Sequence, residues 1–129
     1  MKTYVRGFRG AITVEENTEE AILGATETLL RAMIRENQLV PEDVTAVWLT
    51  TTADLNAAFP AKAVRQIPGW QWVPLMCAQE IPVPDSLPRC IRVMLLAHTQ
   101  KTQQEVRHVF LREAVSLRPD LQTNVAHSP

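Results

Sequence analysis

The clearest pattern of apolar and polar positions lies between Asn17 and Pro41. Apolar side chains recur there at the 3.6-residue spacing of an amphipathic helix: Ile22, Ala25, Leu29, Leu30, Met33 and Ile34. Asn17 or Thr18 can cap the start of this helix, and the two glutamates that follow suit the positive end of the helix dipole. Asn37 and Pro41 bound its end. The segment therefore predicts one long helix that packs its apolar stripe on a core.

Runs of β-branched and long apolar residues predict five strands. They span residues 3–14, 44–52, 73–79, 90–98 and 108–111. Pro60 suits the first position of a short helix over residues 61–67. Pro82, Pro84 and Pro88 exclude regular structure from 81 to 88. Residues 103–107 and 112–117 predict single helical turns.

This order of elements favours an α/β fold of the α+β kind, with a mixed β-sheet, one long helix and one or two short helices. One long helix covers only one face of such a sheet. The strand over 90–98 is apolar on both faces, so the second face would stay exposed and apolar. Trp48, Trp70 and Trp72 also need apolar surroundings. We therefore expect an oligomer whose sheets pack on one another.

Arg92 is the unusual residue of the strand over 90–98. Side chains alternate between the two faces of a strand, so Arg92 shares its face with Met94 and Leu96. An unpaired charge in such surroundings costs on the order of several kcal/mol. Arg92 therefore needs either an internal carboxylate or an anionic ligand, and a structural ion pair is the more frequent explanation.

Two further pairs of residues leave alternatives open. Gly7 and Gly10 can mark a bulge or a close backbone approach in the strand. Arg9, bracketed by glycine and alanine, then has room beside it for a ligand, and the alternative is a plain sheet glycine. Lys62 and Arg65 are three residues apart and so share a helical face. Such a pair is usually a solvated surface, and near a helix start it is also suited to an anion.

Composition narrows the functional classes. The chain has 129 residues, 46% hydrophobic and 21% charged, which suits a globular protein of one domain. A net charge of −1 gives no pull toward nucleic acid or an anionic membrane, and no apolar stretch is long enough to span a bilayer. Ten arginines against three lysines favour a small anionic partner.

Cys77, Cys90 and the three histidines have no spacing typical of a zinc site, so we predict no metal. The N-terminus has no apolar run behind Lys2, so we expect no signal peptide, a cytoplasmic location and no disulfide. Residues 1–121 are expected to form a single domain, and residues 122–129 a flexible tail.

Several short motifs resemble one known family when they are taken together. They are Arg6-Gly7-Phe8-Arg9-Gly10-Ala11 with Thr13-Val14-Glu15, Phe59-Pro60-Ala61-Lys62-Ala63-Val64-Arg65, Gly69-Trp70-Gln71, Gln79-Glu80, Cys90-Ile91-Arg92-Val93-Met94, Arg107-His108-Val109 and Leu117-Arg118-Pro119-Asp120-Leu121. Each string is weak alone. In this order and spacing, from about residue 4 to residue 121, they resemble the monofunctional AroH-class chorismate mutases.

The resemblance implies a homotrimer with a pseudo α/β-barrel core and active sites between subunits. It implies the pericyclic (Claisen) rearrangement of chorismate to prephenate in phenylalanine and tyrosine biosynthesis, without cofactor or metal. This reaction needs no nucleophile–base pair. The ether bond lengthens in the transition state and its oxygen gains negative charge. A protein accelerates such a step by holding the reactive conformer and aiming fixed charges at it.

The same resemblance implies roles for particular residues. The catalytic residues would be Arg92 at the ether oxygen and a carboxylate, Arg9 at a carboxylate, and Glu80 with Cys77 near the ring. The substrate-binding residues would be Phe59, Ala61, Lys62, Arg65, Leu75, Met76, Phe110, Leu117 and Arg118, partly from a neighbouring subunit. Cys77 and Glu80 have opposite parity on a strand, so they share a site only if that strand bulges or ends between them.

Phe110 departs from the family pattern, which has a tyrosine at this position. A phenol there would hydrogen-bond a substrate carboxylate, so we expect weaker binding with the chemistry retained. A Phe110→Tyr variant with unchanged KM and kcat would contradict that expectation. Two alternatives stay open from the residues alone: a non-catalytic trimeric binder of small anionic metabolites, and a trimeric imine or enamine hydrolase of similar architecture.

Overall fold

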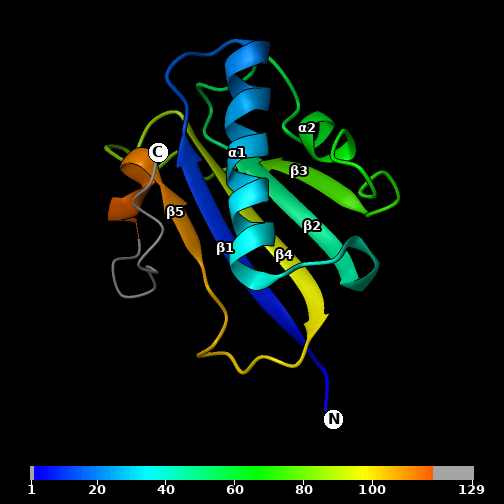
Figure 1. The fold of residues 1–129 in the computed structure, drawn as a ribbon. Coiled ribbons are helices and arrows are strands. Elements are labelled where there is room, and N and C mark those ends of the chain that lie inside the picture. The colour runs from blue at the N-terminus through cyan, green and yellow to red at the C-terminus, as the bar shows by residue number, and fades with distance from the viewer. Residues whose placement is uncertain (1, 118–129) are drawn as a thin grey trace.

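The computed structural model describes residues 2–117 of the chain (Figure 1). Its strands and helices are β1 (Tyr4–Thr13), α1 (Glu19–Asn37), β2 (Val44–Thr51), α2 (Ala61–Arg65), β3 (Leu75–Gln79), β4 (Cys90–Thr99) and β5 (Val109–Leu111), with short 3-10 helices at Pro41–Asp43 and Arg112–Ser116. The strands form one sheet in the order β3-β2-β4-β1-β5. Central β4 is antiparallel to β1 and β2, whereas β3 and β5 are parallel to their neighbours. The predicted mixed sheet with one long helix is confirmed.

Helix α1 lies across one face of the sheet, and α2 lies beside β3 (Figure 1). The core between α1 and the sheet contains fully buried apolar side chains from both layers: Phe8, Ile12, Leu29, Leu30, Met33, Ile91 and Leu95. Thr18 is the N-cap of α1, because its hydroxyl oxygen accepts the Ala21 N–H at 3.1 Å. None of the helices in the described residues has the length and apolarity needed to cross a membrane.

Gly10 lies on the covered face of β1, directly under α1. A Cβ added to Gly10 would be 2.4 Å from the sulfur of Met33 and 3.1 Å from a methyl carbon of Leu29. The glycine is therefore needed for the close approach of the helix, and it makes no room for a ligand beside Arg9. Gly10 is therefore a place of close approach, and the approaching atoms belong to side chains of α1. Gly7 and Ala11 share the face of Arg9, so room for a ligand beside Arg9 stays a prediction.

The face of the sheet opposite α1 is called the free face here. The register of the strands places side chains from four of them on this face: Val5 of β1, Met94 of β4, Trp48 of β2 and Met76 of β3. All four are exposed, from 39% for Met94 to 65% for Met76. The predicted apolar, uncovered face is therefore present in the single chain.

A hydrogen-bonded cluster holds the start of β4 in register. The Arg89 N–H donates to both carboxylate oxygens of Asp54, at 2.9 and 3.2 Å. The Thr52 hydroxyl donates to Asp54 at 2.5 Å and accepts the Cys90 N–H at 3.0 Å. These bonds fix where the strand begins after the proline-rich connection, and so they fix which face Arg92 occupies.

Candidate active site

Arg92 lies in a row of side chains that crosses the free face through all five strands. The backbone register places Arg92 between Thr50 of β2 and Ala11 of β1, with Ala78 of β3 and Phe110 of β5 completing the row. The flanking side chains at Thr50 and Ala11 are short. The guanidinium is therefore not enclosed by long neighbours on the adjacent strands, and its side chain is 37% exposed.

Glu80 supplies the carboxylate next to Arg92. Its N–H donates to the Thr51 carbonyl at 2.8 Å, which extends the pairing of β3 with β2 by one residue. Its Oε2 accepts a hydrogen bond from the Thr50 hydroxyl and lies 3.6 Å from Nε of Arg92. That Nε is buried and has no hydrogen-bond partner among the described residues. The two charges are thus neighbours without a hydrogen bond between Nε and the carboxylate.

Arg9 and Phe110 form the next part of the same face. The Arg9 guanidinium carbon lies 5.5 Å from the centre of the Phe110 ring, within the range of a cation–π contact. Phe110 is fully buried in the chain, in a small cluster with Ala11, Cys90 and Ala114, against which Leu117 also packs. The Phe110 ring therefore packs beneath the Arg9 guanidinium, and in the single chain it is too buried to contact a substrate directly.

Cys90 is a buried thiol close to Arg92. Burial raises the pKa of the Cys90 thiol from 9.0 to about 11, and the positive charge of Arg92 partly opposes this rise. The thiol is therefore neutral at physiological pH. Its neutrality leaves the charge of Arg92 uncompensated on that side.

A second group of predicted residues lines a cavity of about 640 Å³ on the other side of β3. Phe59, Lys62, Arg65 and Cys77 line it, together with residues of the loop before α2. Cys77 pairs with the buried Leu49, so its side chain is on the α1 face of the sheet. This group is separated from Arg92 and Glu80 by the sheet itself.

The loop of this cavity is anchored to the start of α1. The Asn17 side-chain oxygen accepts the N–H groups of Asn56 and Ala57, both at 3.0 Å. Lys62 forms an ion pair with Glu19, with 3.2 Å between Nζ and Oε2. Both side chains are about half exposed, so water and salt weaken this pair.

Nine of the predicted site residues therefore fall into two sets. We name the first the Arg92 half-site, formed by Arg9, Glu80, Arg92, Phe110 and Leu117, and the second the Lys62 half-site, formed by Phe59, Lys62, Arg65 and Cys77. The expected proximity of Cys77 to Glu80 is absent within one chain. The strand keeps its regular pairing through Gln79, and Glu80 extends that pairing, so the two side chains point to opposite faces.

Four further predicted residues belong to neither set. Ala61 is buried in the core, and Leu75 packs partly against the core. Met76 lies on the free face beside Trp48. Arg118 lies outside the described residues, as does the predicted flexible tail over 122–129.

The sequence reasoning missed three residues that contact the two half-sites: Thr50, Cys90 and Glu19. Thr50 and Cys90 are near Arg92 because of strand register and burial. Glu19 reaches Lys62 from 43 residues away in the chain. No local motif signals any of these contacts.

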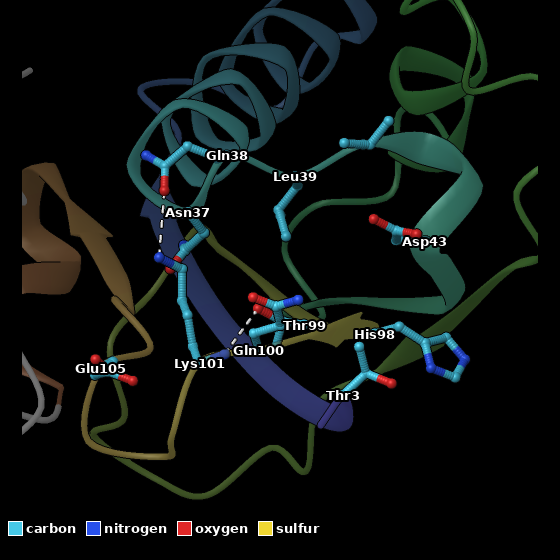
Figure 2. Close-up of a pocket in the computed structure, with 11 residues that line it drawn as sticks. Thr3, Asn37, Gln38, Leu39, Asp43, His98, Thr99, Gln100, Lys101 and Glu105 are labelled. Atoms are coloured by element: carbon cyan, nitrogen blue, oxygen red, sulfur yellow. Dashed lines mark hydrogen bonds between the residues drawn. The ribbon is translucent and has the colours of Figure 1, made fainter. Parts of the chain in front are cut away.

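Another cavity, of about 510 Å³, lies at the far end of the sheet, where α1 ends (Figure 2). Figure 2 shows Lys101 reaching toward Gln38, with 3.2 Å between Nζ and the amide oxygen. Within the described part of the chain, its lining includes none of the predicted site residues. The described residues also contain no cluster of three or more histidine, cysteine, aspartate or glutamate side chains able to hold a metal ion.

Comparisons with known proteins agree on one family. Residues 5–121 match the family described as chorismate mutase type I. The chain is 53% identical over 117 residues to the chorismate mutase AroH of Bacillus subtilis (strain 168), covering 91% of this chain and 92% of that protein. It is 58% identical over 120 residues to the chorismate mutase AroH of Thermus thermophilus, covering 92% and 98% respectively.

The fold agrees as well. A solved chorismate mutase from Clostridium thermocellum superimposes with a TM-score of 0.82 at 44% sequence identity, covering 84% of this chain and 96% of that one. These matches favour the isomerase over the binder and the imine hydrolase. The chain belongs to the chorismate mutase type I family, and its activity is that of a chorismate mutase, an isomerase.

Proposed function

We propose that the rearrangement of chorismate takes place in a cleft between two copies of this chain. In that cleft the Arg92 half-site of one copy faces the Lys62 half-site of the next, and three copies close the assembly. The observation that carries the proposal is the separation of the two half-sites by the sheet. A single copy cannot present both groups to one small molecule, whereas two adjacent copies can.

The free face supports the same assembly. Trp48, Met76 and Met94 expose apolar side chains in the row next to the one that contains Arg92, and Val5 does so farther along β1. A contiguous apolar face is typical of a surface that packs on another protein. Packing of the free faces of neighbouring copies would cover these side chains and bring the half-sites to the edges of the interface. In a closed, symmetric assembly of identical chains, every copy makes the same contacts, so every free face is covered in the same way.

Each charged residue has a proposed role in the reaction. Arg92 stabilises the negative charge that develops on the ether oxygen and binds one carboxylate. Glu80 faces the slightly positive ring, and Arg9, supported by Phe110, binds a carboxylate. Lys62 and Arg65 attract the dianionic substrate from the neighbouring copy, while Phe59 and Leu117 provide apolar walls.

The energetic scale requires several residues to act together. An enzyme lowers its barrier by at least about 8 kcal/mol, whereas one charge-assisted hydrogen bond contributes about 1.5–3 kcal/mol. Fixed charges act without reorganising during the reaction, which is the most effective kind of electrostatic help. Holding the folded conformer of chorismate supplies the remainder.

Mixed assemblies test whether the two half-sites come from different copies. At chorismate concentrations well below KM, Arg92→Ala and a Lys62→Ala/Arg65→Ala double variant are each expected to have little activity, the first through kcat and the second through KM. Unfolding them together and refolding them should restore about a quarter of the wild-type rate, because random mixing gives that share of interfaces with two intact half-sites.

The matched control mixes Arg92→Ala with Glu80→Ala. Both substitutions are in the same half-site, so no interface regains it and the rate should stay low. Recovery in this control, or no recovery in the first mixture, would contradict the proposed cleft. Monomers in light scattering would contradict it as well.

A further inference from the structure

Thr50 is placed to control the distance between the two charges of the Arg92 half-site. It lies on β2 directly beside Arg92, and its side chain is on the same face of the sheet. Its hydroxyl donates a hydrogen bond to Oε2 of Glu80. The next residue, Thr51, accepts the Glu80 N–H through its carbonyl at 2.8 Å. Adjacent residues of β2 therefore hold both the backbone and the carboxylate of Glu80.

The ion pair that Thr50 adjoins is open. Nε of Arg92 lies 3.6 Å from Oε2 of Glu80 and, among residues 2–117, has no hydrogen-bond partner although it is buried. Charge-assisted hydrogen bonds between arginine and carboxylate are usually about 2.7–2.9 Å long. A buried donor without a partner is costly, so this geometry is under pressure to close. The oxygen nearest to Nε is the oxygen that the Thr50 hydroxyl holds.

A closed pair would interfere with the reaction. If the Glu80 carboxylate moved onto Nε, each charge would compensate the other more strongly than it does at 3.6 Å. Arg92 would then have less field to apply to the ether oxygen, and Glu80 less to apply to the ring. Preorganised charges contribute most when they are fixed before the reaction and not already compensated.

We propose that Thr50 is a positioning residue, whose hydroxyl holds Glu80 away from Arg92 so that both charges remain available to the substrate. The proposal rests on the roles proposed above for Glu80 and Arg92. Thr50 itself acts only through Glu80. Only the hydroxyl matters in this role, because a β-branched methyl group would suit the strand equally well without it.

Four variants separate the hydroxyl from the shape of the side chain. Thr50→Val removes the donor and keeps the shape, and Thr50→Ser keeps the donor. Thr50→Ala and Thr50→Ser differ only in the hydroxyl, so they give the same comparison should valine impair folding. The matched control is Thr45→Val, because Thr45 also lies on β2 and its hydroxyl donates to a backbone carbonyl, that of Leu96 at 3.2 Å.

We expect Thr50→Val and Thr50→Ala to lower kcat about 10- to 100-fold, the size of one hydrogen bond to a charged group, with KM changed less than about threefold. Thr50→Ser should keep at least about half of the wild-type kcat, and Thr45→Val should match the wild type. Thermal stability of Thr50→Val should be equal or higher, because the closed ion pair replaces the lost bond. A role in folding alone would lower stability and leave kcat intact.

A double-mutant cycle tests whether Thr50 acts through Glu80. In a Glu80→Ala background, Thr50→Val should cause no further loss of kcat. Additive losses, a serine variant as poor as valine, or full kcat in Thr50→Val would each overturn the proposal for Thr50. Full activity of Glu80→Ala would instead overturn the role proposed for Glu80, so the two failures are distinguishable.

Discussion

The two half-sites of this chain are built in different ways. In the Arg92 half-site, Arg92 and Arg9 lie on β4 and β1, which have hydrogen-bonded neighbours on both sides, and Thr50 and Phe110 support Glu80 and Arg9. The Lys62 half-site is carried by a five-residue helix, the loop before it and the edge strand β3. Its cations are exposed, and Lys62 forms a half-exposed ion pair with Glu19.

This difference suggests a division of labour. Residues on rigid, partly buried strands can hold a charge at a fixed position, which is what stabilisation of a transition state requires. Exposed cations on a loop and a short helix attract a dianion and bind it, but solvent screens them and their side chains move. We therefore expect losses in the first half-site to lower kcat, and losses in the second to raise KM.

The largest effect is expected from Arg92→Ala. Removing one preorganised group that faces developing negative charge costs on the order of 10²–10³ in kcat, and in its proposed role Arg92 also binds a carboxylate. We expect kcat/KM to fall at least about 10³-fold, measured by the spectrophotometric loss of chorismate. The variant should remain folded and assembled, since the free face keeps its apolar side chains.

Arg31→Ala is the matched control, because Arg31 is an exposed arginine on α1 that pairs with Glu27. It should retain the wild-type rate. If Arg92→Ala unfolded or dissociated instead, the arginine would be a structural ion-pair partner of Glu80, as the residues alone first suggested.

A smaller effect is expected from Lys62→Ala. Its side chain is 49% exposed, so we expect KM to rise about 5- to 10-fold and kcat to change less than about threefold. Raising the ionic strength should shrink the difference from the wild type, because the contribution is screened. Lys101→Ala, at the cavity shown in Figure 2, controls for the loss of one surface charge. A fall in kcat as large as that of Arg92→Ala would remove the distinction between the half-sites.

Local patterns predicted most of the fold correctly. The apolar stripe of α1, all five strands and the short α2 follow from periodicity and capping chemistry, which depend on neighbours in sequence. Of the two predicted caps of α1, Asn17 and Thr18, the structure has Thr18. The exposed apolar face was predicted because one long helix can cover only one of the two faces of the sheet. The short 3-10 helix at Pro41–Asp43 was missed, and the strand predicted from residue 73 begins at Leu75.

The arrangement of the site was less accessible to sequence. Parity alone indicated that Cys77 and Glu80 would separate unless the strand bulged or ended between them. β3 ends at Gln79, but the Glu80 N–H continues the pairing and its carboxylate lies at Thr50 and Arg92 on the free face. The contacts of Thr50 with Glu80, and of Glu19 with Lys62, depend on the order of strands and the placement of α1. Gly10 was ambiguous for the same reason: only the position of Met33 shows why a side chain is excluded there.

The smallest effect on catalysis, and a distinct effect on stability, is expected from Cys90. Burial raises its thiol pKa from 9.0 to about 11, so above pH 9 the unfolded chain releases this proton before the folded chain does. The folded state then binds more protons than the unfolded state, and stability falls as pH rises from about 9 to about 11. One pKa unit corresponds to about 1.4 kcal/mol, so the loss of stability approaches about 2–3 kcal/mol by pH 11.

Urea unfolding of the wild type and Cys90→Ala at pH 8 and pH 10.5, at one protein concentration, isolates this contribution of the Cys90 thiol. Cys90→Ala should be less stable than the wild type at pH 8, because the substitution leaves a cavity. The difference in the free energy of unfolding between the two proteins should be smaller at pH 10.5. If the difference in the free energy of unfolding were the same at both pH values, the thiol beside Arg92 would ionise as readily in the folded chain as in the unfolded one.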